Sequence, residues 1–522
     1  MTRAHTSPLT DSVLTPSRRG FLGLSLAAGL VLGLEACGGT STTSGGAGSA
    51  GGTGTITWAW QLPTTWDPVT SSAGSDVQML ALTYDALTAL DEQGNAVPWL
   101  AEKWTYDKAG TSVTFTLAPG LRFSDGSALD ATAVAKSIER GRTQEGSLIA
   151  PQMASIKSVA ADGDLDVFVE LNEVDYQYPL LFAGKTGMVV NPAAFEKDAA
   201  ALATQPAGSG PFTLTSYVQN DHASLEKNPN FSAADEIKVE KFELYPQPDP
   251  STAVAAARSG QFNVVRLGGA QLQQAKDAGL DVQVIDTLFV SVLDVNATMA
   301  PFDDPAVVEA MKYAIDREKL KEVAAFGVGD VSYQPFPPGH VGYNESLADA
   351  FAYDPDKARS ILEEAGVPTP VKAVFTSSGQ SEAAVELIQA MLKDVGIEAT
   401  IESIPQTQHT QLVYLEHSKA LAYDGFAGRE SPVQAFQVLF GAEGLMNPGR
   451  TTDPKLDAQL SKVKQTPTDD PSYPELLQEA TRLAVTSYPN TFLTLVPAVI
   501  ARKGVSELPS SPSLRRFEGV TA

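Results

Sequence analysis

Residues 371–404 have the sequence VKAVFTSSGQSEAAVELIQAMLKDVGIEATIESI, and this stretch decides the fold class of the 522-residue chain. Its beginning, VKAVFTSSGQ, is typical of a strand followed by a loop, and SEAAVELIQAMLKDVG is typical of a helix. The end, IEATIESI, is typical of a second strand. A strand, a helix and a strand in succession indicate a βαβ unit, so we expect a mixed α/β lobe in the second half of the chain.

An earlier stretch, DDPAVVEAMKYAIDREKLKEVAAFG (residues 303–327), carries the start and stop signals of a helix. Asp304 can cap its first turn, Pro305 suits the first helical position and Gly327 suits the end. The residues of its expected inner face are Val308, Met311 and Ile315. The stretch YDPDKARSILEEAGV (353–367) repeats the same pattern, so a further helix is expected there.

Strand signals open the N-terminal half, where TITWAW (residues 55–60) is typical of a buried strand. The sequence TSVTFTLAPG (111–120) alternates apolar and polar residues before a Pro-Gly turn. The apolar residues expected on one face are Val113, Phe115 and Leu117. A turn and then a helix are expected over SDGSALDATAVAKSIERGR (124–142), with Asp130 as the N-cap.

Size and composition limit the possible functions. A chain of 522 residues exceeds the roughly 250–300 at which one hydrophobic core stops growing, so we expect two or more lobes. The formal net charge of −25 would repel phosphate backbones, which argues against nucleic acid as a partner. One cysteine permits no internal disulfide, and the few histidines match no common ligand spacing, so we expect no metal and no cofactor. The sequence has no nucleophile elbow, zinc motif or phosphate-binding loop, so we expect no catalytic residues and no enzyme.

The N-terminal stretch SRRGFLGLSLAAGLVLGLEACGGT (residues 17–40) is typical of an export signal. Two arginines precede an apolar run of about fourteen residues, which is shorter than the roughly twenty that a membrane-spanning helix needs. SRRGFL also looks like a twin-arginine motif, which would imply export in the folded state. Residues 1–37 are therefore expected to be a signal peptide.

Cys37 directly follows LEA, where a bacterial lipobox places the cysteine that becomes lipidated. That motif usually has a small or hydroxylated residue where this chain has Glu35. The alternatives are a buried inert thiol and a reactive nucleophile, and neither suits a cysteine between an apolar signal and a flexible tract. The tract of glycine, serine and threonine, residues 38–54, would tether the folded body to a lipid anchor on the outer face of the cytoplasmic membrane.

Residues 66–140 carry short motifs in a recognisable order: Asp-Pro, Tyr-Asp-x-Leu, Pro-x-Leu-Ala-x-x-Trp, Phe-x-Leu, Phe-x-Asp-Gly and a Val-rich helix. Colinear stretches follow at 208–231, 248–265, 293–320 and 336–343. Together they resemble the extracellular solute-binding proteins of family 5. Members of that family deliver oligopeptides, dipeptides, nickel chelates and related compounds to ATP-binding-cassette importers.

The resemblance implies an α/β fold of the periplasmic-binding-protein type (class II, cluster C), with two lobes and an extra subdomain inserted in lobe I. Lobe I is expected over residues 55–290 and is completed by 491–522, with the subdomain at roughly 83–207. Lobe II is expected over 291–490. The stretch PNTFLTLVPAVIARKGV, which begins at Pro489, would be the strand that returns to lobe I. The ligand would lie between the lobes, which close on it by a hinge motion.

Ligand contacts in that family come from the loop after the first strand, here WQLPTTWDP, and from an aromatic-rich loop of lobe II, here YDGFAGRESPVQAF. The candidate ligand-binding residues are therefore Gln61, Trp66, Phe426 and Arg429. An aromatic ring offers apolar area with little rotamer freedom to lose, and an arginine can bind a carboxylate through two hydrogen bonds. The alternatives are packing within the lobes for Trp66 and Phe426, and a surface or structural ion pair for Arg429.

Two charged anchors of dipeptide-binding relatives are missing from this chain. Those relatives hold the amine with an aspartate where this chain has RESPV, and they hold the carboxylate with an arginine that AVFTSSGQ lacks. This argues against a tight dipeptide receptor and leaves open a longer peptide or a non-peptide solute. Arg429 suggests an anionic or carboxylate-bearing group on that solute.

The resemblance implies a monomeric lipoprotein on the periplasmic or extracellular side of the cell membrane. It would capture a peptide or a related small solute and deliver it to the membrane permease of an importer. The alternatives are a sensor or adhesion protein that reuses the fold, and a secreted hydrolase.

Overall fold

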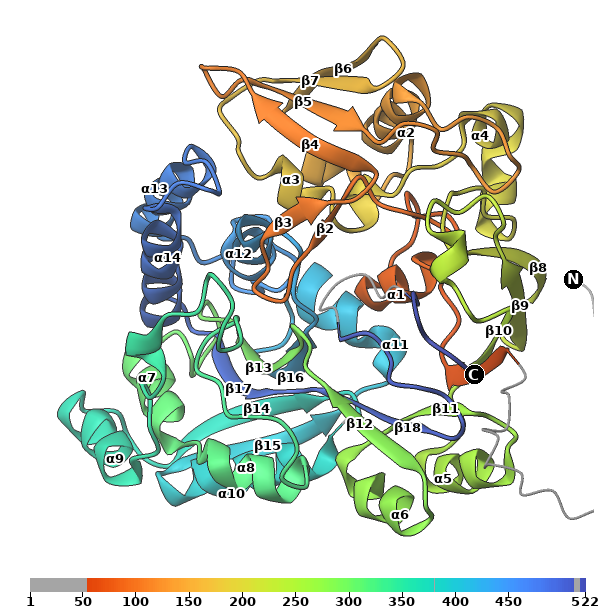
Figure 1. Cartoon of the computed structure of the whole chain (residues 1–522). Coiled ribbons are helices and arrows are strands. Elements are labelled where there is room, and N and C mark those ends of the chain that lie inside the picture. Colours follow the sequence, from red (N-terminus) through yellow and green to blue (C-terminus); the bar gives the residue numbers. More distant parts are fainter. Residues whose placement is uncertain (1–53, 380, 511–516) are drawn as a thin grey trace, which may run out of the picture. The chain divides into compact units, whose positions relative to one another are not determined.

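The computed structural model describes residues 54–379, 381–510 and 517–522 (Figure 1). The expected signal peptide and the expected lipidation site, Cys37, lie outside these residues. So does the expected linker, apart from Gly54.

The described residues form four β-sheets, and the largest has seven strands in the order β12-β18-β11-β1-β10-β9-β8. We call the part of the chain built on this sheet lobe I. Its strands are β1 (Thr55–Trp60), β8 (Phe212–Val218), β9 (His222–Lys227), β10 (Lys241–Pro246), β11 (Val264–Leu267), β12 (Asp281–Ile285) and β18 (Ala498–Arg502). The first strand, β1, is central and pairs in parallel with β10 and β11, whereas β18 pairs antiparallel with β11 and β12.

The second sheet has five strands in the order β15-β14-β16-β13-β17, and we call the part built on it lobe II. Its strands are β13 (Val290–Val295), β14 (Val371–Ser377), β15 (Ile397–Ser403), β16 (Leu421–Phe426) and β17 (Thr491–Leu495). β14, helix α10 (Glu382–Asp394) and β15 form the βαβ unit predicted from residues 371–404, and the two strands pair in parallel. The prediction of a mixed α/β fold is confirmed.

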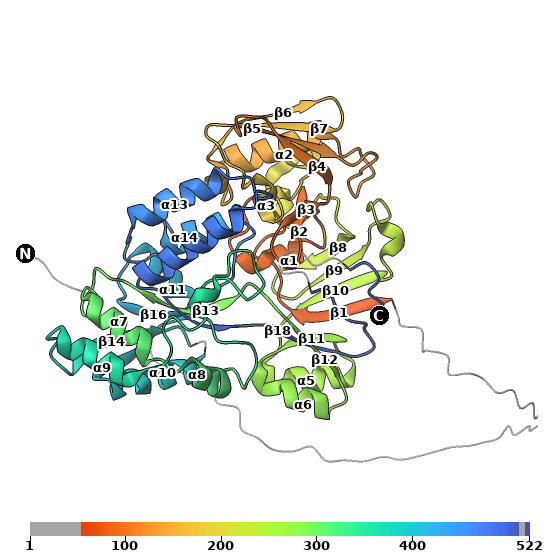
Figure 2. The same cartoon turned by 60° about the vertical axis from the view of Figure 1, so that its left-hand side comes forward.

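Helices cover both faces of the lobe II sheet (Figures 1 and 2). Leu293 of β13 is buried among the helices of one face and Val292 among those of the other, because successive side chains of a strand point to opposite faces. The helices of the first face are α7 (Pro305–Ala314), α8 (Arg317–Ala324), α9 (Pro355–Glu364) and α10. The helices of the second face are α12 (Pro432–Phe440), α13 (Pro454–Lys464) and α14 (Tyr473–Ser487).

A four-stranded antiparallel sheet in the order β4-β5-β7-β6 packs against helix α2 (Ala131–Thr143). Its strands are β4 (Ala101–Tyr106), β5 (Ser112–Leu117), β6 (Ile156–Asp162) and β7 (Asp166–Leu171). The apolar face predicted for β5 is buried, and Asp130 caps α2 by accepting a 2.9 Å hydrogen bond from the amide of Ala133, as predicted. The other helices and strands are α1 (Val77–Leu80), β2 (Thr88–Leu90), β3 (Ala96–Pro98), α3 (Tyr178–Leu181), α4 (Pro192–Asp198), α5 (Pro250–Ser259), α6 (Leu272–Asp277) and α11 (Gln406–His409).

The helix expected over residues 303–327 is two helices, so that prediction is wrong in its middle. α7 begins as predicted, but Ile315 has an extended backbone and α8 begins at Arg317. The buried guanidinium of Arg317 donates to the carbonyls of Lys312 and Ile315 at 3.3 and 3.4 Å. It also donates to the carbonyl of Phe492 in β17 at 2.8 Å. These hydrogen bonds satisfy the end of α7 and fix the break against the sheet.

Two crossings connect the lobes. Residues 286–289 lead from β12 to β13, and residues 496–497 lead back from β17 to β18. The stretch PNTFLTLVPAVIARKGV thus forms one strand in each lobe. The crossings lie side by side, because the amide of Val496 donates to the carbonyl of Phe289 at 2.8 Å.

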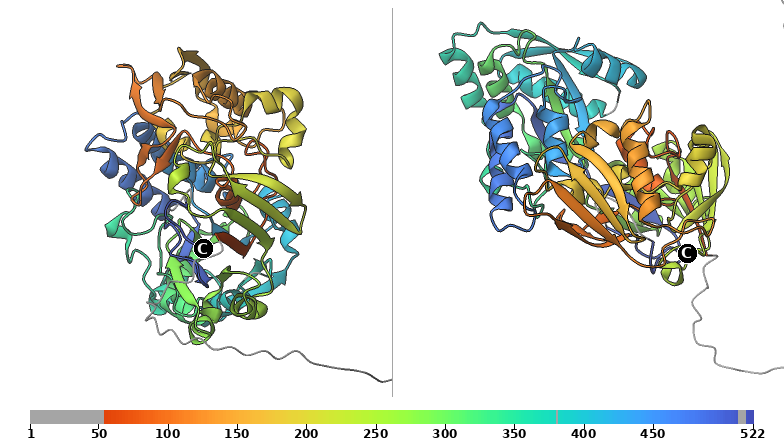
Figure 3. Two further views of the ribbon diagram at one scale, coloured as in Figure 1. Left: turned by 45° about the vertical axis from the view of Figure 1, so that its right-hand side comes forward. Right: turned by 90° about the horizontal axis from the view of Figure 1, so that it is seen from above.

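The described chain begins and ends at one place in lobe I. The amide of Gly54 donates to the carbonyl of Ala522 at 2.9 Å, beside the start of β1 (Figure 3). None of the helices in the described ranges has the length and apolar character that crossing a bilayer requires.

Candidate functional site

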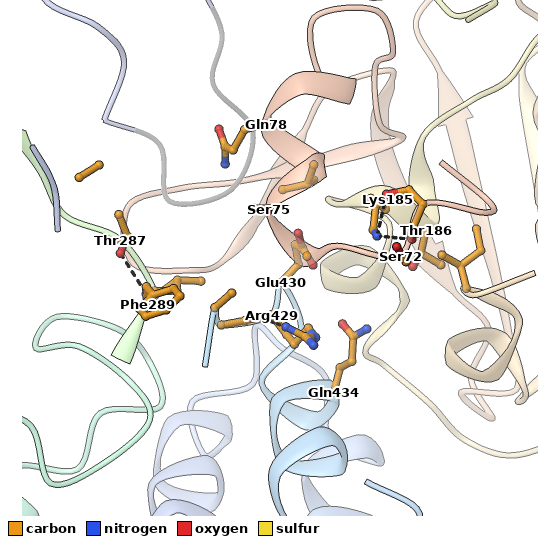
Figure 4. Close-up of a pocket in the computed structure, with 18 of the residues that line it drawn as sticks. Ser72, Ser75, Gln78, Lys185, Thr186, Thr287, Phe289, Arg429, Glu430 and Gln434 are labelled. Atoms are coloured by element: carbon orange, nitrogen blue, oxygen red, sulfur yellow. Dashed lines mark hydrogen bonds between the residues drawn. The ribbon is translucent and has the colours of Figure 1, made fainter. Parts of the chain in front are cut away.

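A cavity of about 300 Å³ lies where the two crossings pass between the lobes (Figure 4). The lobe I sheet supplies Trp60, Arg266 and Ala498 to its lining. The loop after β16 in lobe II supplies residues 427–430, and the crossing from β12 to β13 supplies residues 286–289. The cavity is therefore built from segments of both lobes that are far apart in the sequence.

The loop that precedes α1 forms one wall of the cavity, and a buried carboxylate fixes its shape. Asp76 accepts hydrogen bonds from the hydroxyl of Ser71 at 2.8 Å and from the hydroxyl of Thr64 at 2.5 Å. It also accepts the backbone amide of Thr64 at 3.1 Å. Because these groups belong to two segments of the loop, one side chain holds the whole wall in place. Ser71 and Ser75 of this wall line the cavity.

Lys185 reaches the same wall from the segment that follows α3 (Figure 4). Its ammonium donates to the carbonyls of Ser71 and Ala73 at 2.9 and 3.2 Å and to the hydroxyl of Ser71 at 3.3 Å. Burial lowers the pKa of Lys185, whereas the carboxylates of Asp76 and Glu430 raise it. Neutral oxygens thus occupy the three donors of Lys185, and its positive charge remains beside the cavity.

Arg429 faces the cavity from lobe II, in the loop between β16 and α12. Ser431 caps α12 by accepting the amide of Gln434 at 3.4 Å, which fixes the end of this loop. The guanidinium of Arg429 donates to the carbonyl of its neighbour Gly428 at 2.5 Å, and its central carbon lies 5.3 Å from the centre of the Phe426 ring. Burial lowers the pKa of Arg429, and the adjacent carboxylate of Glu430 raises it.

Arg266 faces the cavity from β11 of lobe I. Burial lowers the pKa of its guanidinium. Within the described part of the chain, this guanidinium makes no hydrogen bond and no ion pair. The same side chain lines a neighbouring cavity of about 380 Å³, so it stands at the junction of the two spaces.

Beside the cavity, lobe II touches the part of the chain that carries the four-stranded sheet, through the segment between β7 and α3. The amide oxygen of Gln177 accepts hydrogen bonds from the hydroxyl of Ser431 at 3.2 Å and from that of Tyr473 at 3.3 Å. The carboxylate of Glu430 packs against Gly184 so closely that a Cβ at position 184 would lie 2.3 Å from its carboxyl carbon. A side chain at position 184 would therefore require the side chain of Glu430 to move.

A salt bridge and a ring contact add to this closure. Lys464 at the end of α13 pairs with Glu173 at 2.6 Å, and its carbonyl accepts the amide of Tyr176 at 2.8 Å. In a separate contact, the ring of His340 lies so close to Gly94 that an added Cβ would be 2.5 Å from Nε2. The structure therefore has the lobes in contact around the cavity.

The four ligand-binding residues predicted from the sequence have different places. Arg429 lines the cavity, and Gln61 lies next to the wall because its amide donates to the hydroxyl of Ser75 at 3.0 Å. Trp66 is 0% exposed and packs edge-on against Tyr217 in the lobe I core. Phe426 is 1% exposed in the lobe II core, beneath Arg429. The structure thus places Arg429 in the lining of the cavity, Gln61 beside its wall, and Trp66 and Phe426 in the cores of the two lobes.

Sequence reasoning missed Lys185 and Arg266. Both are single cations inside apolar runs, in LLFAGKTGMVV and NVVRLGG. A charge within a run that is otherwise buried is costly unless the fold gives it a partner or a ligand does. A single cation within an apolar run was therefore the sequence signal that could have identified both residues.

The arrangement suits reversible binding of a polar solute. Cations, carboxylates, amides and hydroxyls alternate with apolar groups such as Trp60, Ile149 and Phe289, which is the usual composition of a ligand pocket. A search of the described residues finds no group of three or more histidine, cysteine, aspartate or glutamate side chains that could hold a metal ion.

Comparisons with known proteins identify a matching family and similar chains. Residues 95–445 match the family model described as bacterial extracellular solute-binding proteins, family 5. The glutathione-binding protein GsiB of Salmonella paratyphi A is 27% identical over 389 residues, which are 73% of each chain. The GsiB protein of Escherichia coli O157:H7 is 26% identical over the same length.

Solved structures share the fold at lower identity. The periplasmic binding protein DppA of Helicobacter pylori, in complex with the peptide STSA, has a TM-score of 0.78 and 22% identity, and the match covers 90% of this chain and 98% of that one. NikZ of Campylobacter jejuni, in complex with Ni(L-His), has a TM-score of 0.75 and 19% identity, with 89% and 96% covered. Both are similar to this chain in their two-lobe architecture.

Proposed function

The chain belongs to the bacterial extracellular solute-binding proteins of family 5, and we propose that it binds a peptide or a peptide-like solute in the cavity between its lobes. Like its relatives, the chain is a solute-binding protein and not an enzyme. The observation that carries the proposal is the position of Arg429 in a cavity lined by both lobes, where its guanidinium makes one hydrogen bond among the described residues. A carboxylate is the natural partner of such a group.

The choice of a peptide-like solute has two supports. GsiB is named for glutathione, and the DppA structure holds a peptide. The cavity also offers serine, glutamine and threonine side chains that can bind a main chain, among them Ser72, Gln78, Gln152, Thr186 and Gln434.

Ligand-dependent thermal stability tests this function. A solute that binds only the folded protein raises the melting temperature with the logarithm of its concentration over Kd. We expect this shift from short peptides that carry a free carboxylate, with the peptide recovered intact afterwards. Cleavage of the peptide, or no shift from any peptide in a diverse panel, would contradict the proposal.

We further propose that the lobes correspond to residues 55–290 with 491–522 (lobe I) and 291–490 (lobe II), with a lobe I subdomain at roughly 83–207. The support is the strand membership of the two large sheets, which changes at the crossings 286–289 and 496–497. Cleavage by a protease of low specificity should concentrate at these crossings rather than within either sheet.

Export and anchoring are the remaining parts of the proposal. The arginine pair and the apolar run in residues 17–34 support a twin-arginine signal, and Cys37 supports a lipid anchor that keeps the protein near the permease of an importer. Cys37→Ala should release the exported protein from the membrane fraction. A variant that remains fully membrane-bound would refute the anchor and leave the binding function untouched.

A further inference from the structure

We propose that the solute carries two anionic groups, one bound by Arg266 of lobe I and the other by Arg429 of lobe II. The ligand would then link the two lobes by charge. This inference rests on the proposed binding function and adds the chemical class of the ligand.

The two arginines differ from Arg140 and Lys312, which are buried cations among the described residues. Arg140 binds the carboxylate of Asp67 through two hydrogen bonds of 3.1 and 2.5 Å. Lys312 donates to the carbonyls of Val485 and Tyr488 at 3.1 and 2.6 Å. At these two positions the fold itself provides the acceptors. At Arg266 it provides none among the described residues, and at Arg429 it provides one neighbouring carbonyl.

A guanidinium without an acceptor is unfavourable in a half-buried cavity. It keeps its charge in proteins, and burial removes the water that would stabilise that charge. A carboxylate of a ligand restores the lost stabilisation through two parallel hydrogen bonds. The free donors of Arg266 and Arg429 therefore indicate one anionic group for each.

The two carboxylates among the described lining residues do not fill this role. Burial lowers the pKa of Arg429, and the carboxylate of Glu430 offsets this shift only in part, because Glu430 makes no hydrogen bond to Arg429 and packs on Gly184 instead. Asp286 lines the cavity as well, yet burial alone sets the direction of the Arg266 pKa. Three cations and two acids among the lining residues leave the cavity with an excess of positive charge in a chain whose net charge is −25.

Because the two arginines stand on different lobes, a dianion bound to both would affect how the lobes are arranged. Arg266 stands on β11 of the lobe I sheet, and Arg429 on the loop after β16 of the lobe II sheet. A ligand bound at both ends would favour the arrangement in which the lobes are together, because only then can both pairs form. A solute with one anionic group would hold one lobe only.

Calorimetric titration of three matched tripeptides tests this inference. Ala-Gly-Glu has two carboxylates, Ala-Gly-Gln has one and Ala-Gly-Gln amide has none. We expect the protein to bind Ala-Gly-Glu about ten- to a hundredfold more tightly than Ala-Gly-Gln, and Ala-Gly-Gln more tightly than the amide. Arg266→Met and Arg429→Met should each abolish the preference for the second carboxylate. Arg258→Met, which removes an exposed arginine of α5, is the matched control and should leave all three affinities unchanged.

The outcomes separate the inference from the proposed function. Equal affinity for the charged and neutral peptides, or an unchanged preference in Arg266→Met, would overturn the two-anion ligand and leave peptide binding standing. If no tripeptide binds but the dicarboxylate adipate does, with the same dependence on Arg266 and Arg429, the two-anion ligand stands and the peptide is wrong. Binding of none of these probes would overturn both.

Discussion

At the scale of single residues, the buried ion pair of Asp67 and Arg140 anchors the first part of lobe I. The side chains are 3% and 5% exposed, and the pair joins the loop after β1 to α2. Removing one partner of a buried pair leaves the other charge without compensation.

We therefore expect Asp67→Asn to lower the free energy of unfolding by about 3–5 kcal/mol, measured by chemical denaturation. Glu196→Gln is the control, because it breaks the Lys136–Glu196 pair, whose side chains are 51% and 53% exposed. That change should cost no more than about 1 kcal/mol. Equal losses in the two variants would contradict the role assigned to Asp67.

His340 gives the protein a predicted sensitivity to acid. Burial lowers the pKa of His340 to about 4, and the charge of Asp91 opposes the shift only weakly. Its Nδ1 accepts the amide of Gly342 at 3.0 Å, and its ring stacks on Phe336 with a centroid distance of 4.7 Å. The folded protein thus keeps this ring neutral at a pH where the unfolded chain binds a proton.

The direction in which stability changes with pH follows from this difference in proton binding. Between pH 6.5 and 4 the unfolded state holds more protons at this site, so the stability that is present above pH 6.5 falls as the pH falls. The loss reaches about 3 kcal/mol at the lower end. His340→Asn, measured by denaturation across this range, should remove that part of the slope, whereas His222→Asn at a more exposed site should not. A slope that is the same in His340→Asn would contradict the prediction.

At the scale of elements, α13 of lobe II forms an ion pair with the segment before α3. Lys464 pairs with Glu173 at 2.6 Å, and the two side chains are 21% and 60% exposed. Lys464 also lies 3.6 Å from the buried carboxylate of Asp175, and both contacts join α13 to the segment before α3.

Lys464→Met should therefore raise the Kd for the ligand about two- to fivefold, measured by calorimetry, because the closed form becomes less populated. Lys157→Met is the matched control, since Lys157 pairs with Glu170 at 2.7 Å within the four-stranded sheet. An equal change in Kd from both variants would show that Lys464 does not act through closure.

The helices and strands that follow from the local pattern of apolar and polar residues were predicted correctly. The βαβ unit at 371–404 follows from its own residues, and so does the buried face of β5. The break between α7 and α8 could not be predicted, because it depends on the contact of Arg317 with Phe492, which is 175 residues away in the sequence.

The residues of the site, too, could be predicted only where they do not depend on contacts between distant parts of the chain. Arg429 was predicted because the family resemblance marks its loop, and the cavity contains it. Arg266 and Lys185 were missed, because strands and loops from distant parts of the chain bring them to the cavity. Trp66 and Phe426 have aromatic rings of the kind that can line a pocket, but both are buried. Their burial depends on neighbours from distant parts of the chain, such as Tyr217 beside Trp66, which no local pattern identifies.

At the scale of the whole molecule, the proposed function couples ligand binding to the arrangement of the lobes. The two crossings, 286–289 and 496–497, are the connections between the lobe sheets, and the first of them also lines the cavity. A ligand that contacts both lobes stabilises the arrangement in which they meet, and this is the form that a membrane permease would recognise.

Native mass spectrometry of the purified protein with an equimolar pool of short peptides tests the central claim most directly. We expect one intact peptide per chain, enriched for sequences with two carboxylates, and no such complex in the Arg266→Met, Arg429→Met double variant. The same complex in the double variant, or peptides released as fragments, would contradict the account.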